Sequence, residues 1–465
     1  MSGKDEFLPR VIIESNEYGG SFRMNFKLVG PGRDTVPEGA KEVLESFEDW
    51  TAFCIASIKH MPPMSGFGYH ITDYQIKEEV LAYLKDNAIS SEETPVNAEG
   101  NKNNGVRHSF IIHDDDVAAV AQKMATTSHL LKAASSIQRA NLSALIAEFD
   151  FLLLRLLRSV CLDFPELLIP GDETISVGYL RSGKSVQDWE ADQVEKVLSK
   201  KLRGSHKDLI DWILSDIAKL NDLSYVKKDS HYRDFLEVCQ RRHLFIHAGG
   251  VVNKEYLENC ISAGIPKDSL PKLGTQLDID HEYLRSAAAR VYVVGSYILH
   301  LVFQQVYRAH ASKSYSALLS ASHEFLLAEL TKMAARIVEF AEFNKAKFDN
   351  DLRLKFGINK ALTKLFEPGV EEEAQSRNAE LELARYDWSV TDPVLALALA
   401  CVKRDFENLL ELAQSAHTAG LSHKDAKAFA VFREARETEG FMECFPKSSL
   451  LITDESLSVS SSTET

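Results

Sequence analysis

The sequence is poor in the features that mark disulfide-rich, fibrous and membrane-embedded proteins. Its 465 residues include 6 cysteines, 23 glycines and 13 prolines. The cysteines are scattered, with no Cys-x-x-Cys pair, so we expect no metal site and no disulfide framework, and a reducing cytoplasm fits best. We find no stretch apolar enough for long enough to span a bilayer, and the N-terminus MSGKDEFLPR lacks the apolar core of a secretory signal. We therefore expect a cytoplasmic globular protein of several domains with no membrane partner.

Positive charge is also in deficit. The chain has 53 lysines and arginines against 68 aspartates and glutamates, a net charge of −15. A protein that coats nucleic acid non-specifically needs an extended basic surface, so this balance argues against that class. It leaves room for an enzyme whose positive charge is confined to one cleft.

Hydrophobic periodicity divides the chain into three parts and a tail. Residues 1–130 mix strand-like and helix-like segments and predict a small α/β domain of unknown role. Long helical patterns with short links at 135–310 predict an up-and-down helical bundle. Residues 312–447 contain helical hairpins at a spacing that resembles tetratricopeptide repeats, and the Ser/Thr-rich tail at 448–465 is expected to be disordered. The predicted fold class is mainly α, with a small N-terminal α/β domain.

Within the first part, alternation of apolar and polar residues predicts strands, and helical periodicity predicts helices. The expected strands are 11–15, 21–29 and 108–114, the expected helices are 40–58 and 72–87, and Ser90–Gly105 is expected to be a polar loop. Thr72 or Asp73 can cap the second of these helices.

One segment matches a nucleotide-binding pattern. GYLRSGKS, at Gly178–Ser185, fits G-x-x-x-x-G-K-[ST], but no apolar strand precedes it and the helix-like stretch after it is acidic. A phosphate loop needs that strand and a helix packed against it. We interpret the segment as a surface turn; a nucleotide-hydrolysing switch that uses Gly183, Lys184 and Ser185 is the weaker alternative.

The stretch CQRRHLFIHAGGVVNKEYL, from Cys239 to Leu257, gathers arginines and histidines at one expected helix end. On a helix, Arg242 and His247 are about 140° apart, and the long arginine stem can close that gap. His243 and His247 share one face. Gly249 or Gly250 suits the helix C-terminus, and Asn253 can cap the next helix.

These residue types suit RNA cleavage without a metal. The ribose 2′-hydroxyl must lose a proton and the leaving 5′-oxygen must gain one, and histidine titrates near neutrality. Arginine offers a permanent forked cation to the phosphate in the transition state. The structural alternative is that the histidine only complements the helix dipole and the arginines form a solvated face.

The same stretch resembles the signature of the HEPN superfamily, an arginine, a polar residue, three others and a histidine, continued here as HAGGVVNKEYL. The resemblance implies a four-helix bundle, usually paired so that two motifs share one cleft. It implies metal-independent RNA cleavage that leaves a 2′,3′-cyclic phosphate, commonly in toxin or phage-defence systems. Carried over, Arg242 stabilises the phosphate, His247 is the acid/base, and His243 fills the polar position that orients or donates.

Further residues are candidates for supporting roles. The family's first helix often contributes a polar group to the cleft, for which Glu148, Asp150 and Arg155 qualify here; Asp150 and Arg155 could equally form a buried ion pair. Asn253 is a further supporting candidate. Candidates for RNA binding, with a solvated helix face as the alternative, are Arg241, Lys200, Lys201 and Arg203.

The sequence thus predicts a regulated HEPN-type endoribonuclease. We expect a homodimer with a composite active site, RNA as substrate with transfer RNA as one candidate, no cofactor, and a regulatory protein partner on the C-terminal hairpins. The alternative is a catalytically silent HEPN module that binds RNA or protein on a helical-repeat scaffold.

Overall fold

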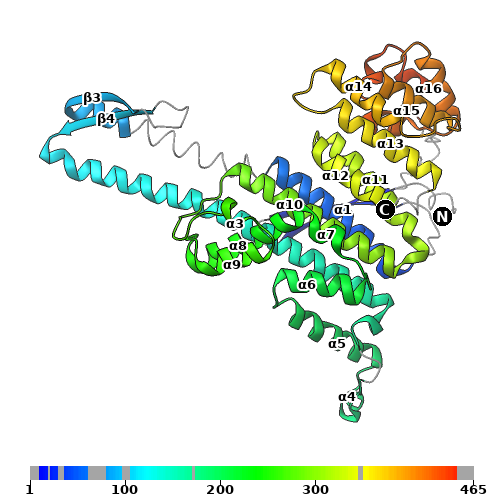
Figure 1. Cartoon of the computed structure of the whole chain (residues 1–465), viewed down its shortest axis with the longest axis horizontal. Helices are drawn as coiled ribbons and strands as arrows, with labels where there is room; N and C mark the ends of the chain where they lie inside the picture. Colours follow the sequence, from blue (N-terminus) through cyan, green and yellow to red (C-terminus); the bar gives the residue numbers. More distant parts are fainter. Residues whose placement is uncertain are drawn as a thin grey trace, which may run out of the picture.

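The chain is mainly helical, with two separate two-stranded antiparallel sheets (Figure 1). The computed structural model describes residues 10–18, 21–29, 36–60, 80–96, 105–169, 173–343 and 349–447. Strand β1 (Arg10–Tyr18) pairs with β2 (Ser21–Val29), and β3 (Ala88–Val96) pairs with β4 (Gly105–Ile112). The predicted strands 11–15 and 21–29 are confirmed, and the third, 108–114, is confirmed as far as residue 112, where β4 ends. The loop predicted from residue 90 is wrong over its first part, because pairing with β4 overrides the weak strand preference of SSEETPV. Thr72 and Asp73 lie outside the described residues.

The body of the protein is a bundle built around helix α10 (His281–Val306). Long helices α1 (Glu38–Lys59), α3 (Val117–Asp163) and α8 (Ser230–Ala248) pack against α10. Helix α10 is long and apolar enough to cross a membrane, but 83% of its apolar window is buried in the bundle. The expectation that no stretch has this composition was therefore wrong. Helix α10 is apolar because it is buried on all sides and not on one face alone.

Helix α1 belongs to this bundle and not to a separate N-terminal domain. Its apolar residues recur at helical spacing, and Phe47 and Trp50 lie in the same core as α3 and α10. The Trp50 indole N–H donates to the Tyr292 carbonyl at 3.4 Å. Gly295 permits the approach, since a Cβ there would lie 2.9 Å from Trp50 Nε1. The α/β domain predicted at 1–130 is thus not found in the part of the chain that the structure describes.

Helix α3 is longer than the pattern from residue 135 predicted. Its C-terminal part lies in the core, while its N-terminal part projects from the bundle and carries β3 and β4 at its far end (Figure 1). Shorter elements complete this region: η2 (Asp114–Asp116), η3 (Pro165–Leu167), α4 (Val177–Arg181), α5 (Val186–Lys201), α6 (His206–Trp212), the π-helical η4 (Ile213–Ile217), α7 (Ser224–Lys228), α9 (Lys254–Ser262), η5 (Lys267–Ser269) and η6 (Arg308–His310).

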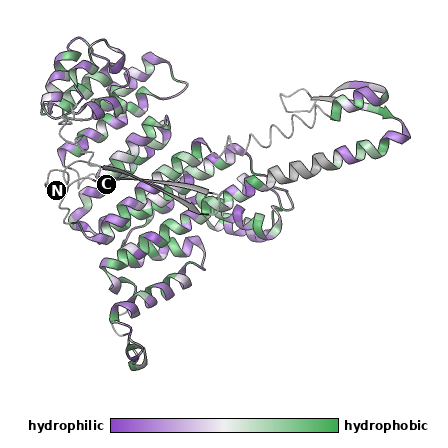
Figure 2. Cartoon of the chain, turned by 180° about the vertical axis from the view of Figure 1, so that it is seen from behind, coloured by the Kyte–Doolittle hydropathy of each residue, from purple (hydrophilic) through white to green (hydrophobic). Residues whose placement is uncertain are grey.

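The C-terminal third forms successive helical hairpins, as predicted. They are α11 (Ala311–Leu327) with α12 (Thr331–Phe343), α13 (Asn350–Leu365) with α14 (Glu372–Leu383), and α15 (Pro393–Lys403) with α16 (Leu409–Thr418), followed by α17 (His423–Ala428), η8 (Ala430–Phe432), η9 (Ala435–Glu437) and η10 (Met442–Cys444). One hydrophobic core continues from the bundle into these hairpins. The buried His300 of α10 and Ser314 of α11 are hydrogen-bonded at 2.7 Å across the boundary. Figure 2 shows green and purple residues interspersed along most helices, the amphipathic pattern that such packing requires. A tetratricopeptide-like arrangement stays a prediction.

Candidate functional site

The candidate site lies on the last turns of α8, whose two ends are set by local rules. Asp229 caps the start by accepting the His231 backbone N–H at 2.8 Å. Gly249 and Gly250 end the helix with φ of 60° and 89°, values that favour glycine. The Gly250 N–H donates to the Leu244 carbonyl at 3.2 Å. The predicted glycine termination is confirmed, and His247 lies in the last turn, where the helix dipole favours a cation.

His243 and His247 lie on the exposed side of α8, and Arg242 lies next to His243 in the same turn. Both histidines are exposed and their ring centroids are 4.4 Å apart. Arg242 is half-buried, and its Nε is buried without a hydrogen-bond partner. None of the three makes an ion pair within the described residues. Ile246, 48% exposed, falls between Arg242 and His243 around the helix.

Arg241 is mostly buried and paired with Glu237, so the prediction that it binds RNA is corrected to a structural role. Its Nε donates to Glu237 Oε1 at 2.7 Å, and the side chains of Arg241 and Glu237 are only 17% and 11% exposed. Glu237 also accepts the hydroxyls of Tyr256 at 2.7 Å and Tyr283 at 2.8 Å. The Arg241 guanidinium lies 4.0 Å from the Tyr283 ring centroid. This network holds α8, α9 and α10 together.

The three polar candidates on α3 do not converge. Asp150 Oδ1 is 2.8 Å from His206 Nε2, whereas Arg155 donates to Asp49 of α1 at 2.9 Å. Asp150 and Arg155 are therefore not paired with each other. Glu148 is exposed.

His206 links α6 to α3 and α8. Burial disfavours its charge, but the neighbouring Cys239 and Asp150 outweigh burial and raise the pKa of His206 to about 10. A positive His206 therefore compensates Asp150, and Asp150 is committed to a structural ion pair rather than to the cleft.

Two further groups of candidates are placed elsewhere. Asn253 caps α9, because its Oδ1 accepts the Tyr256 N–H at 2.8 Å. Lys200, Lys201 and Arg203 lie at the end of α5, and the Lys201 ammonium is 4.5 Å from the Trp212 ring centroid. Figure 1 places α6 between α5 and α8. No described contact brings these basic residues to Arg242.

The GYLRSGKS segment comprises most of α4 and the turn between α4 and α5, so the predicted surface turn is confirmed only over its second half. Lys184 Nζ donates to Asp192 at 2.9 Å, and the Tyr179 hydroxyl donates to the same carboxylate at 2.7 Å. Ser185 caps α5 in a capping box with Asp188. The lysine and serine that a phosphate loop would use are thus engaged within the turn.

Arg139 on α3 is a residue that sequence patterns missed. Its guanidinium lies 5.3 Å from the ring centroid of Phe245 on α8, and its Nε is buried without a partner. The sequence could have pointed to Arg139, because it falls on the same face of α3 as the buried Leu142 and Ile146, where a charged residue is unusual.

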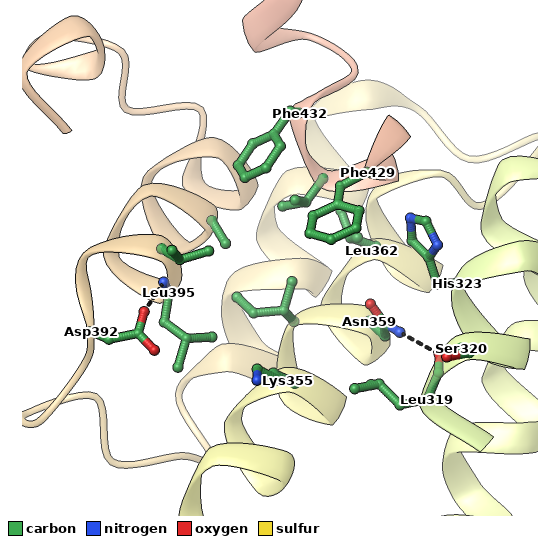
Figure 3. A pocket seen from close by; sticks show the side chains of 14 residues that line it. Leu319, Ser320, His323, Lys355, Asn359, Leu362, Asp392, Leu395, Phe429 and Phe432 are labelled. Carbon is green, nitrogen blue, oxygen red and sulfur yellow. Dashed lines mark hydrogen bonds between the residues drawn. The ribbon is translucent and has the colours of Figure 1, made fainter. Parts of the chain in front are cut away.

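A second concave feature lies among the C-terminal hairpins (Figure 3). This cavity of about 420 Å³ is bounded by α11, α13, α15 and η8. Most of its lining is apolar, with Phe429 and Phe432 on one side. Asn359 Nδ2 donates to Ser322 at 2.7 Å, and His323 Nε2 accepts the Ala430 N–H at 3.0 Å. Such a cavity has the size and polarity of small-ligand sites.

The site therefore consists of an Arg/His helix end on a mainly helical bundle. Among the described residues, no group of three or more His, Cys, Asp or Glu side chains could hold a metal ion. No protein-family model, curated protein or solved structure matches the chain.

Proposed function

We propose that the chain is a HEPN-type endoribonuclease that cleaves RNA without a metal. The observation that carries the proposal is that Arg242, His243 and His247 form no ion pair or hydrogen bond with the described residues and gather at one end of α8, where both histidines are exposed. In a protein with a net charge of −15, an arginine without a carboxylate partner among the described residues is available for an anionic substrate.

In this proposal each side chain has a separate role. His247 moves the proton of the attacking 2′-hydroxyl or of the leaving 5′-oxygen, Arg242 stabilises the charge on the phosphate, and His243 orients the phosphate or donates to it. The product carries a 2′,3′-cyclic phosphate. Transfer RNA is the first substrate to test, and a regulated toxin or phage-defence effector is the biological role that fits.

A second copy of the chain completes the site. Arg242 and His247 diverge by about 140° around α8, and exposed Ile246 provides apolar surface between them. A homodimer that covers Ile246 would bring two motifs to one cleft. Ile246→Asp should dissociate the dimer and abolish cleavage, measured by light scattering and RNA electrophoresis.

Purified protein with transfer RNA and total RNA in excess EDTA tests the function. Wild type should cleave, whereas His247→Ala should be slower by about 10²–10⁴-fold. Equal cleavage by the two proteins would refute the assignment of His247, and no cleavage by wild type at any concentration would refute the function.

The second candidate function is a silent binding module, and the cavity of Figure 3 is the observation that favours it. In that case the hairpins hold an apolar group of a regulatory partner protein. Ala398→Phe would fill the cavity and weaken the binding of that partner. A protein that never cleaves RNA but loses its partner on this substitution would support the module.

A further inference from the structure

We propose that Arg139 of α3 is a second guanidinium of the RNA phosphate site, so that Arg139 and Arg242 together bind a phosphodiester between α3 and α8. This inference deepens the proposed function and rests on it. It assigns a role to a residue outside the Arg/His motif.

The packing of α3 against α8 brings Arg139 to the last turns of α8. The rings of Phe149 and Phe235 are 4.7 Å apart, and Arg139 lies over Phe245 at 5.3 Å. Residue numbers thus fall along α3 as they rise along α8, so the helices are antiparallel and Arg139 faces the last turns of α8. Arg242 precedes Phe245 by three positions, and side chains at this spacing have Cβ atoms about 5–6 Å apart.

Arg139 and Arg242 have similar electrostatic environments. The Nε atoms of both are buried without a hydrogen-bond partner, and neither guanidinium has a carboxylate partner in the described chain. Arg241, Arg336 and Arg404 do have one, in pairs with Glu237, Asp229 and Glu434. The half-buried Arg233 and Arg436 donate to backbone carbonyls instead. A buried charge is costly unless it is paired. The chain therefore leaves the anion of this site to be supplied by a ligand.

The chemistry of the site favours a phosphodiester. Two forked guanidinium groups match the oxygens of a phosphate better than ammonium groups do. The neighbouring His243 and His247 can supply the proton transfers that attack of a ribose 2′-hydroxyl on the phosphorus requires. The simpler alternative is that Arg139 only packs on Phe245, a cation–π contact that needs no ligand.

A 2′-O-methyl RNA oligonucleotide tests the inference, because it has phosphates but cannot be cleaved by 2′-hydroxyl attack. Its dissociation constant would be measured by fluorescence anisotropy at several salt concentrations. Arg139→Gln should weaken binding about tenfold and lower the slope of log affinity against log salt by about 0.7–0.9, as the loss of one phosphate contact predicts. The matched control is Arg377→Gln, which removes an exposed arginine of α14. It should change neither quantity.

The outcomes separate this inference from the proposed function. If Arg242→Gln weakens binding while Arg139→Gln behaves like Arg377→Gln, the function stands and the role of Arg139 is overturned. If wild type neither binds the oligonucleotide nor cleaves RNA, the proposed function fails and this inference with it. Arg139→Lys keeps the positive charge but not the forked guanidinium. It should therefore retain the slope of log affinity against log salt and lose part of the affinity. Unfolding in urea checks that each variant is folded.

Discussion

The two adjacent arginines of α8, Arg241 and Arg242, should respond differently to the same substitution. Arg241 is held by Glu237 in a buried network, whereas Arg242 has no hydrogen-bond or ion-pair partner among the residues that the structure describes. We expect Arg241→Met to lower stability while Arg242→Met leaves stability unchanged and lowers RNA binding. The sequence letters are identical, so only the environments distinguish them.

The magnitude for Arg241 follows from its contacts. Its removal leaves the Glu237 carboxylate, 11% exposed, without its cation, and losing one partner of a buried pair costs about 3–5 kcal/mol. The hydroxyls of Tyr256 and Tyr283 still donate to Glu237, which places the cost near the lower end, about 3 kcal/mol. Arg242 is only half-buried and makes no ion pair with the described residues, so Arg242→Met should change stability by less than about 0.5 kcal/mol.

Urea unfolding followed by circular dichroism measures both effects, with RNA binding on the same samples. The double variant Arg241→Met with Glu237→Gln should recover about half of the loss, because a neutral amide no longer needs the cation and still accepts from a tyrosine. The reasoning would be refuted if Arg242→Met were the less stable protein, or if Arg241→Met unfolded like wild type.

Three further predictions concern the surrounding fold. Gly250→Ala should cost about 1–3 kcal/mol and Gly249→Ala less, since only the first adds a Cβ that would lie 2.5 Å from Phe245 Cε1; equal urea midpoints for the two would contradict this. Burial lowers the pKa of His300 to about 3, below its unfolded value near 6.5, so its stabilising effect is present above pH 6.5 and is lost as pH falls from there toward 3. Between pH 7.5 and pH 5, protonation of the unfolded-state imidazole should lower the free energy of unfolding by about 2 kcal/mol. His300→Gln should flatten that part of the pH profile of stability, as urea unfolding at each pH would reveal. Magnesium-dependent nucleotide binding, measured calorimetrically, should be absent in wild type and in Lys184→Ala alike, because the lysine is engaged by a carboxylate of α5; binding that the substitution abolishes would restore the phosphate loop.

Local rules predicted the end of α8 well. Glycines that tolerate positive φ and an asparagine that caps the next helix act within a few residues, so Gly249, Gly250 and Asn253 could be placed from sequence. The helical hairpins of the C-terminal third follow from periodicity in the same way.

Long-range packing could not be predicted in this way. The amphipathic pattern of α1 marks a buried face without saying which helices bury it, and strand β3 forms only because β4 pairs with it. Arg241 and Arg242 look alike until Glu237, Tyr256 and Tyr283 are brought together from three helices.

The most direct test of the account is the chemistry of the RNA ends made by wild type in excess EDTA. A transfer RNA labelled at its 5′ end would be incubated with wild type and with His247→Ala, and the 3′ ends of the fragments would be identified by mass spectrometry. The proposed mechanism predicts 2′,3′-cyclic phosphate ends from wild type and at least a hundredfold fewer fragments from His247→Ala. Fragments ending in a 3′-hydroxyl, or intact RNA after prolonged incubation with wild type, would contradict it.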